Sequence, residues 1–566
     1  MTTDARPDRT RAWLPHALAA IAIAIMVIAL VRAEARVGVT VDEHGHLLRG
    51  LAIWWAPDTR FAWPHPPLPH ALVALPTVLT SPAVDFTALA GWDEADFTRS
   101  VKAYWMHVGY DVARAQLVAG RRVVIGIAAL VAAYLWWWAR RRMGPTIAMV
   151  VLLLWLSHTV LLAHATLVTN DFAAACAALV VTTTLLDLVR LPRVRRAVWF
   201  GIACGAALVT KLSLVPIVAL ALVILVGGAA LGVGGFRFVE PRRRRATQGL
   251  HTSTIATAVA WLVVLATHRF DRIVVTAGDY NAHLGRPGWR GGPEHVLALP
   301  SWTPLVLPHS WVFSAQFIRK QNARGHAGWF MGEQNEGGDA RYFPMLALFK
   351  TPLGTMILFG AGAAAVAIAI RRRRRPDIVA AVGLAFTLAF FAMASTSRIN
   401  IGFRHAAPSI GWIVLVAGRG AAWCWRRRTG RAIVIGATAA STLGAAIAWP
   451  RFLGDFNALA GGRSGGLRIN LAEEDWGQDT PDLAAYLVEN RAKPVHLFTR
   501  ASTMSQELRH FGVRHRVLKC TEPATGWIVV GVKDWTERAE CFAWLDAPIV
   551  HVVDDHLFVF VVDAAR

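Results

Sequence analysis

The segment VDEHGHLLRGLAIWW (41–55) places two adjacent carboxylates, Asp42 and Glu43, and two histidines, His44 and His46, just after an apolar run. A carboxylate at the end of a membrane span is costly to desolvate, so it is a candidate functional group. It can act as a general base for a hydroxyl, as a metal ligand or as a proton carrier. The histidines could complete a metal site with Asp42, although this spacing differs from common structural zinc patterns. Stabilisation of a helix N-terminus is the simpler explanation for either carboxylate.

The chain that must position these groups is too apolar for an ordinary soluble enzyme of its size. It has 566 residues, of which 55% are hydrophobic and 17% charged, and its mean hydropathy is +0.41. This composition predicts an all-α polytopic membrane protein. The net charge of +22 does not indicate nucleic-acid binding, because the basic residues form short arginine blocks between apolar runs.

Apolar runs long enough to cross about 30 Å of hydrocarbon, which takes roughly 20 helical residues, predict about 11 transmembrane helices. We expect them at 15–33, 120–139, 145–163, 170–190, 197–211, 213–234, 252–269, 352–370, 377–395, 406–424 and 431–449. The pair from 197 to 234 could instead be one long helix with a re-entrant piece. The first run is expected to be retained rather than removed as a signal peptide, because the chain beyond it also spans the membrane.

The arginine blocks predict the orientation, because Lys and Arg in short loops stay in the cytoplasm. With the N-terminus inside, every dense block falls on the inner side, namely 140–142, 190–196, 242–245, 371–375 and 426–428. The outer side then carries a first loop (34–119), a long loop (270–351) and everything after about residue 450. Polar groups that are not arginine anchors gather on that side, which predicts a site at the outer boundary of the cell membrane.

Two outer pieces have compositions of their own. The long loop is rich in Gly, Trp and His and is too long to be a mere connection, so we expect a lid or an acceptor-binding loop. After the transmembrane module (1–450), the segment 451–566 predicts a small extracytoplasmic α/β domain, with a helix at TPDLAAYLVEN, strands at PVHLFT and GWIVVGV, and a hairpin at PIVHVVDDHLFVFVV. The DWGQD motif (475–479) is expected to be structural. Cys520 and Cys541 could form a disulfide there.

Six sequence motifs follow one another along nearly the whole chain. They are DEHGHLLRG with HPPLPHALVALP, TLVTNDFAAACAAL, GAALVTKLSLVPIVAL, YFPMLALFKTPLG, INIGFRHAAP and EEDWGQDTPDLAAYL. In order and sidedness they resemble polyprenyl-phosphate-dependent glycosyltransferases of the GT-C fold (glycosyltransferase family 39 type). That group includes protein O-mannosyltransferases and lipid A aminoarabinose transferases.

The resemblance implies that a sugar moves from a polyprenyl phosphate to an acceptor with inversion of the anomeric centre. Asp42 matches the first-loop catalytic acid of the family, with Glu43 beside it, and Asp171 matches the acidic residue of the second outer loop. The first-loop carboxylate is then expected to deprotonate the acceptor, which attacks C1 of the sugar. No cofactor is expected to be required, although a divalent metal near His44 and His46 stays open.

Cations must offset the charge on the departing phosphate. The sequence offers five candidates for contacts to the phosphate or the sugar, namely Arg404, Lys211, His65, Lys350 and His405. Arg404 has a planar fork suited to phosphate, and Lys211 interrupts an apolar stretch, where a charge needs a partner or solvent. Snorkelling to the lipid headgroups is the alternative for both, as is interfacial anchoring for Lys350. The prolines after His65 could simply fix the shape of the loop.

The expected partners are the lipid-linked sugar donor, a lipid, glycan or protein acceptor, and membrane lipids. A transporter or lipid flippase is the alternative, since it would also keep charged residues near the membrane. Such proteins are expected to show inverted repeats or paired broken helices, and the sequence has no such internal symmetry. The sequence leaves open the identity of the sugar and the acceptor, the metal dependence and the oligomeric state.

Overall fold

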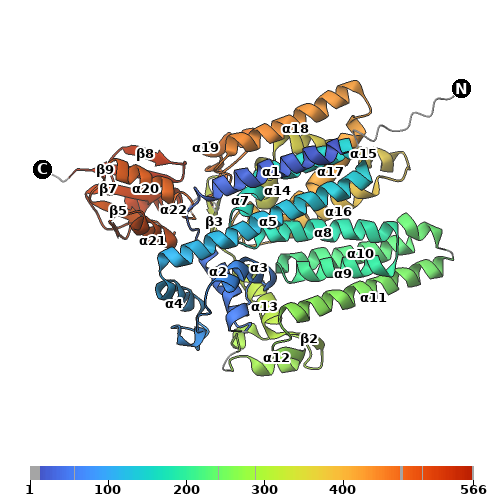
Figure 1. Cartoon of the computed structure of the whole chain (residues 1–566), viewed down its shortest axis with the longest axis horizontal. Coiled ribbons are helices and arrows are strands. Elements are labelled where there is room, and N and C mark those ends of the chain that lie inside the picture. Colours follow the sequence, from blue (N-terminus) through green and yellow to red (C-terminus); the bar gives the residue numbers. More distant parts are fainter. Residues whose placement is uncertain are drawn as a thin grey trace.

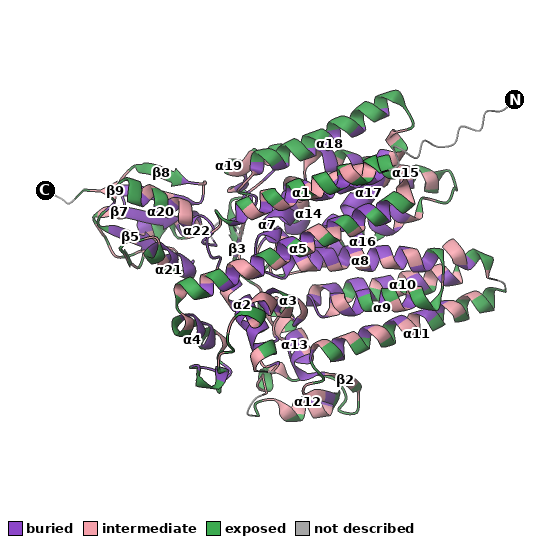
Figure 2. Cartoon of the chain, in the orientation of Figure 1, coloured by how far each residue is buried: buried purple, intermediate pink, exposed green. Residues whose placement is uncertain are grey.

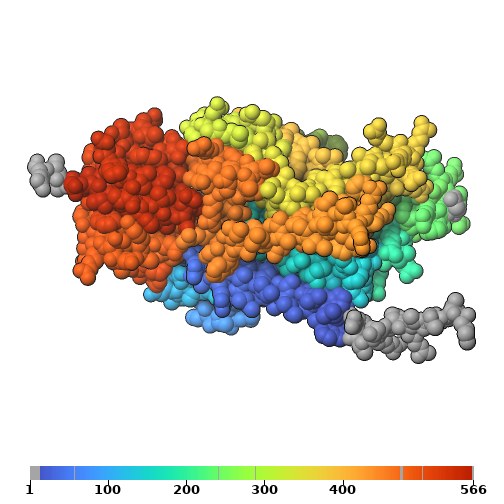
Figure 3. Space-filling model, turned by 90° about the horizontal axis from the view of Figure 1, so that it is seen from above, coloured from blue at the N-terminus to red at the C-terminus, as the bar shows by residue number. Residues whose placement is uncertain are grey.

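The computed structural model describes residues 13–56, 58–239, 241–286, 289–471, 476–499 and 501–563. It has two parts, a long bundle of helices and a smaller domain with a β-sheet at the C-terminal end (Figure 1). The C-terminal domain caps one end of the bundle, and the first helix begins near the other end. Seen from above, the cap packs directly against the bundle (Figure 3). The predicted combination of a helical membrane protein with a C-terminal α/β domain is confirmed.

Seven of the described helical segments are long and apolar enough to cross a membrane, and the number rises to eight if one bent pair counts as a single span. The seven are α1 (Leu14–Glu34), α5 (Tyr110–Met143), α8 (Asp171–Arg190), the segment Leu212–Phe238 that contains α10 (Val215–Ala230), α11 (Arg242–Thr267), α15 (Leu353–Arg371) and α18 (Arg428–Ala448). The bent pair is α6 (Pro145–Leu156) and α7 (Thr159–Ala165), whose axes differ by 62°.

Each of the eleven predicted spans coincides with helical structure. Eight of these predicted spans correspond to the seven long segments and the bent pair. The other three correspond to shorter helices, namely α9 (Val194–Leu208), α16 (Ile378–Ala394) and α17 (Pro408–Cys424). The uncertain region from 197 to 234 forms two helices, because the backbone at Lys211 is extended (φ −155°, ψ 131°) and ends the helical hydrogen bonding there. The total of about 11 spans stays a prediction.

The surface of the bundle is apolar where a bilayer would surround it. On α1, Leu18, Ile21, Ile25 and Ile28 are 49% to 61% exposed, whereas α17 is buried along almost its whole length (Figure 2). A soluble protein would bury such an outer face. Close packing inside the bundle uses small residues, as membrane helices commonly do. A Cβ on Gly201 of α9 would lie 2.6 Å from the carbonyl oxygen of Ala256 on α11.

The loops that are predicted to lie outside form short elements at the end of the bundle nearest the C-terminal domain (Figure 1). Those of the first loop are α2 (Glu43–Trp55), α3 (Leu68–Thr80), the 3-10 helix η2 (Phe86–Ala88) and α4 (Phe97–Val108). The long loop forms two antiparallel strand pairs, β1 (Ile273–Thr276) with β2 (Pro304–Pro308) and β3 (Gly328–Phe330) with β4 (Glu333–Asn335). It also forms α12 (Ala277–His283), η5 (Pro293–His295), α13 (His309–Arg324) and α14 (Tyr342–Lys350). The 3-10 helix η6 (Phe403–Ala406) precedes α17, and η3 (Leu212–Leu214) and η4 (Gly234–Phe238) flank α10.

The C-terminal domain is built on a five-stranded sheet of order β6-β5-β7-β9-β8. Its strands are β5 (Val495–Phe498), β6 (His515–Val517), β7 (Gly526–Gly531), β8 (Ile549–Val553) and β9 (Leu557–Val562). The β5 strand is parallel to both β6 and β7, whereas β9 is antiparallel to β7 and β8. The helices around it are α20 (Thr480–Glu489), α21 (Ser502–His510), α22 (Val532–Glu537) and η8 (Ala539–Phe542), after η7 (Ala458–Ala460) and α19 (Gly462–Gly466).

The helix and strands predicted for this domain are confirmed, including the hairpin of β8 and β9. Apolar side chains of β7 point to both faces of the sheet. Val529 belongs to the hydrophobic cluster on one face, and Ile528 and Val530 belong to the cluster on the other. Cys520 and Cys541 are joined by a disulfide. The boundary between residues 450 and 451 stays a prediction.

Candidate active site

A cavity of about 530 Å³ opens where the short loop elements meet the ends of the long helices. Its polar side is lined by residues from five separate segments, namely Asp42, His46, His65, Asn170, Asp171, Lys211, Ser213, Arg404 and His405. Its apolar side comes from α13, α14, the end of α16 and the segment that follows α16, with Phe317, Ile318, Phe343, Phe390, Met393, Ile399 and Ile401. Most of the polar residues singled out in the sequence therefore share one cavity.

Asp42 is the N-cap residue of α2 and forms an ion pair with Arg404. Nη1 of Arg404 donates to Oδ2 of Asp42 over 2.9 Å. The side chain of Asp42 is 44% exposed, so a ligand in the cavity can reach it, whereas that of Arg404 is 13% exposed. The enclosed position of Asp42 would raise its pKa, but Arg404 and then His46 outweigh this, and the pKa lies below its usual value. Asp42 is therefore ionised at neutral pH.

A second ion pair lies in the same cavity. Asp171 is the first residue of α8, and Lys211 occupies the extended break between α9 and η3. Nζ of Lys211 lies 2.5 Å from Oδ1 of Asp171, and both side chains are almost fully buried. The break in the helix explains this arrangement, because it turns the lysine toward the cavity instead of the surrounding lipid. Lys211 thus has the partner that its apolar sequence context demands.

The histidines of the cavity add little positive charge at neutral pH. Burial lowers the pKa of His46 to about 4, and Arg49 acts in the same direction. Burial also lowers the pKa of His65 well below its usual value. The ring of His46 lies parallel to that of His65, with 5.7 Å between centroids, and its Nδ1 is 3.2 Å from Nδ1 of His70. Two carboxylates and two cations therefore leave the cavity close to neutral.

The metal alternative receives no support from the arrangement of ligands. In the described part of the chain, no group of three or more His, Cys, Asp or Glu side chains is placed to hold a metal ion. His44 does not line the cavity, and its ring packs edge-on against Trp105 at 6.1 Å.

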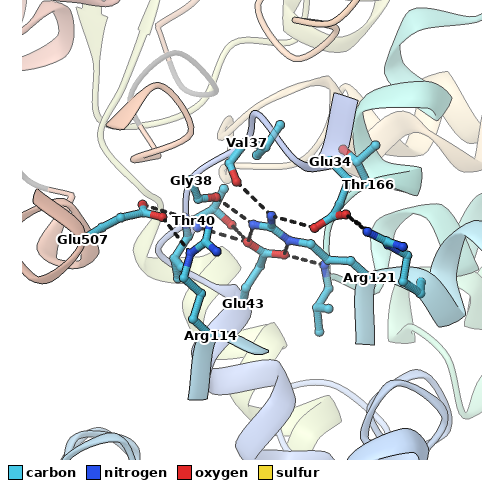
Figure 4. A network of polar contacts seen from close by, with 12 residues as sticks. Glu34, Val37, Gly38, Thr40, Glu43, Arg114, Arg121, Thr166 and Glu507 are labelled. Atoms are coloured by element: carbon cyan, nitrogen blue, oxygen red, sulfur yellow. Dashed lines mark hydrogen bonds and ion pairs between the residues drawn. The ribbon is translucent and has the colours of Figure 1, made fainter. Parts of the chain in front are cut away.

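Besides His44, two predicted site residues lie outside the cavity. Glu43 is fully buried, and it accepts hydrogen bonds from Nε and Nη2 of Arg121 (2.8 and 2.6 Å) and from the backbone amide of Val168 (2.8 Å) (Figure 4). It also accepts from the backbone amide and hydroxyl of Thr40, each at 3.0 Å. Lys350 donates to the carbonyl oxygen of Leu453 over 3.0 Å.

One contact residue of the tail is not singled out by the sequence. Trp476 lies beneath Arg404, whose Cζ is 4.0 Å from the centre of the indole ring. The only available signal was the DWGQD motif, which was interpreted as structural; Asp475, its first residue, lies outside the described residues. The contribution of α13 to the cavity wall also went unrecognised, since the long loop was predicted only as a lid or an acceptor-binding loop.

No protein-family model matches the chain, and no curated protein matches its sequence. Solved structures similar to it include ArnT from Cupriavidus metallidurans. The form bound to undecaprenyl phosphate has a TM-score of 0.45 and 15% identity, covering 98% of this chain and 99% of that one. The apo form has a TM-score of 0.47 and 13% identity, covering 98% of both chains. An oligosaccharyltransferase from Archaeoglobus fulgidus, in complex with zinc and sulfate, has a TM-score of 0.42 and 13% identity, covering 92% of this chain and 69% of that one.

Proposed function

We propose that the protein is a membrane glycosyltransferase that moves a sugar from a polyprenyl phosphate to an acceptor on the extracytoplasmic side of the cell membrane. The observation that carries this proposal is the cavity in which an accessible carboxylate, Asp42, is paired with Arg404 and shares the lining with a second cation, Lys211. A base for a hydroxyl and positive charge for a phosphate are the two requirements of this reaction. Phe390 and Met393 at the end of the apolar helix α16 line the cavity, so we expect a lipid-linked substrate to enter it from the bilayer.

In the proposed reaction, the acceptor hydroxyl loses its proton to Asp42. Its oxygen forms a bond to C1 of the sugar from the face opposite the phosphate, and the bond between C1 and the phosphate oxygen breaks. The polyprenyl phosphate leaves with the electron pair of that bond, and its additional negative charge lies against Arg404 and Lys211. A positioned base of this kind contributes about 10² to 10⁴ in rate.

The ion pairs of the free protein give the donor phosphate a specific role. Arg404 and Lys211 are each bound to a carboxylate before the donor arrives. A phosphate that enters the cavity competes with Asp42 for Arg404 and with Asp171 for Lys211. Release of Asp42 from Arg404 raises its affinity for a proton, which makes it a stronger base in the complex than in the free protein. Donor binding would thus activate the base.

The test is a transfer assay with purified protein in lipid, supplied with a panel of polyprenyl-phosphate sugars and the lipids and glycans of the source membrane. We expect formation of free polyprenyl phosphate together with a glycosylated product found by mass spectrometry. The Asp42→Asn variant should lose at least about 100-fold in kcat and still bind the donor. Asp93→Asn is the matched control, since Asp93 is an exposed aspartate of the same loop.

Two results would contradict this proposal. Wild-type turnover by Asp42→Asn would remove Asp42 from the chemistry and shift attention to Asp171. Movement of a solute or lipid across the membrane, with no new glycosidic bond for any donor, would instead support the transporter or flippase alternative.

A further inference from the structure

We propose that Trp476 is a positioning residue for Arg404, and that the C-terminal domain thereby completes the active site. This inference rests on the proposed function, because it assigns Arg404 to the phosphate. The carrying observation is that the guanidinium of Arg404 lies between the indole ring of Trp476 on one side and the carboxylate of Asp42 at its edge. The ring itself is buried, with 8% of Trp476 exposed.

The position of the guanidinium over the indole ring suits a cation that must exchange partners. An aromatic ring attracts the flat face of a guanidinium, and it leaves the N–H groups at the edges free to bind a carboxylate or a phosphate. Arg404 could therefore turn within its own plane from Asp42 to a phosphate without losing the contact with Trp476. A side chain without a π face would not hold the plane of the guanidinium in this way.

The same short segment of the tail also fixes the backbone next to Asp42. The amide of Val41 donates to the carbonyl oxygen of Trp476 over 3.0 Å. The amide of Gly38 donates to the carbonyl oxygen of Gln478 over 2.8 Å. The amide of Trp476 donates to Oε1 of Gln478 over 2.8 Å. Residues 476–478 thus hold both members of the ion pair, the base through its neighbour Val41 and the cation through the indole ring.

Further contacts from the C-terminal domain anchor this arrangement. Glu507 on α21 accepts from the amide of Val39 over 2.8 Å, and its other oxygen lies 3.5 Å from Nε of Arg114 on α5 (Figure 4). The hydroxyl of Thr503 donates to the carbonyl oxygen of Val39 over 2.8 Å. The position of Trp476 is therefore set by a domain that is docked at several points around the first loop.

The test compares Trp476→Leu, which removes the π face, with Trp476→Phe, which keeps one. The first measurement is the affinity of each purified variant for undecaprenyl phosphate in lipid nanodiscs. Loss of a cation–π contact corresponds to a factor on the order of 3 to 30, so we expect Trp476→Leu to weaken binding by that factor and Trp476→Phe to retain most of the affinity. In the transfer assay, the KM for the donor should rise in the same proportion.

A double-mutant cycle separates positioning from general damage to the fold. In an Arg404→Met background, Trp476→Leu should weaken phosphate binding little further, because the residue it positions is already gone. Trp535→Leu is the matched control, since Trp535 packs on Phe542 and Phe560 in the core of the same domain. It should lower thermal stability without a specific loss of phosphate affinity.

Unchanged phosphate affinity in Trp476→Leu, or equal losses in the Leu and Phe variants, would overturn the positioning role. Additive losses in the Arg404→Met background would overturn it as well. Failure of the proposed function is a different outcome, because it would appear as absence of sugar transfer by the wild-type protein, while phosphate binding would still report on Trp476.

Discussion

At the scale of single residues, the cavity keeps its two carboxylates and two cations in contact with each other. Such pairing lowers the cost of holding charges near a bilayer, and it sets a condition for any anionic ligand. The binding free energy that a phosphate gains from Arg404 and Lys211 is reduced by the free energy of the contacts that Asp42 and Asp171 lose. A group with a full negative charge should therefore displace the two carboxylates from the cations more readily than a neutral group.

Replacement of the cations should distinguish residues of the cavity from residues of the fold. Arg404→Ala and Lys211→Ala should weaken both donor binding and turnover, because the phosphate is charged in the ground state and in the transition state. A loss of about 10-fold or more in donor affinity is expected for each, since charged hydrogen bonds contribute about 1.5 to 3 kcal/mol. The measurement is donor affinity by titration, together with kcat and KM.

Lys350→Met is the matched comparison, because Lys350 lies outside the cavity and donates to Leu453. This variant should lower the melting temperature with little change in donor affinity. If it instead weakens donor binding as strongly as Lys211→Ala, Lys350 belongs to the phosphate site in a state that differs from the one described.

The pKa of Asp42 gives a prediction about pH dependence. In the free protein this pKa is lowered, chiefly because Arg404 outweighs the effect of burial. Asp42 therefore stays deprotonated, and kcat/KM, which reports the free enzyme, should not fall through this group between pH 7 and about pH 5. If Arg404 contacts the phosphate in the donor complex, as proposed, the pKa of Asp42 rises there and the acid limb of kcat should lie at a higher pH. Acid limbs that coincide in kcat and kcat/KM would contradict the exchange of partners.

At the scale of secondary-structure elements, Glu43 connects three of them. It begins α2, binds Arg121 of α5 and accepts the amide of Val168 just before α8 (Figure 4). Burial would raise the pKa of Glu43, but Arg121 and the backbone amides outweigh it and lower the pKa. These contacts of Glu43 with Arg121 and Val168 hold α2, the helix whose N-cap is Asp42. We infer that Glu43 positions the base and does not take the proton itself.

Glu43→Gln should therefore act mainly on stability. Arg121 would keep only the longer contact with Glu34, whose Oε1 lies 3.7 Å from its Nη1. Removal of one partner from a buried ion pair costs about 3 kcal/mol. The matched control is Glu94→Gln, because Glu94 and Arg99 form a pair whose side chains are 63% and 60% exposed, and such pairs contribute about 1 kcal/mol or less. Thermal unfolding in a single detergent measures both. A stable Glu43→Gln protein with no turnover would instead place Glu43 in the chemistry.

At the scale of the whole molecule, the bundle has two different ends. The cavity, the short outer elements and the C-terminal domain lie at one end, and the connections that carry the arginine blocks, such as those between α10 and α11 and between α15 and α16, lie at the other (Figure 1). Arginine-rich short loops are retained in the cytoplasm. The described chain thus has the polarity that an extracytoplasmic active site requires. The N-terminal arginines Arg6, Arg9 and Arg11 lie outside the described residues.

Reporter fusions test this orientation. A reporter fused after Arg375 should be cytoplasmic, and one fused after residue 460 should be extracytoplasmic, because the two positions lie at opposite ends of the bundle. Activity of a phosphatase reporter, which needs the oxidising side, and fluorescence of a cytoplasmic reporter measure the two fusions. If both reporters are found in the same compartment, the predicted orientation is wrong and the site is not assigned to the extracytoplasmic side.

The sequence by itself determined the class of the protein, the positions of the helices, the α/β character of the tail and the charged and histidine residues of the cavity. Hydropathy and periodicity are local properties, so a run such as 431–449 predicts α18 (Arg428–Ala448) without any knowledge of its neighbours. A charge in an apolar stretch, as at Lys211, is likewise visible locally, because only a partner or solvent makes it tolerable.

The tertiary structure decided which of these residues meet. Two adjacent residues have different surroundings, since Asp42 faces the cavity and Glu43 contacts Arg121. The reason is that successive side chains at the start of a helix point in different directions. The contact of Trp476 with Arg404 joins residues 72 positions apart, and that of Val39 with Glu507 joins residues 468 positions apart. No local pattern encodes such pairings, since they arise only when the C-terminal domain docks on the outer end of the bundle.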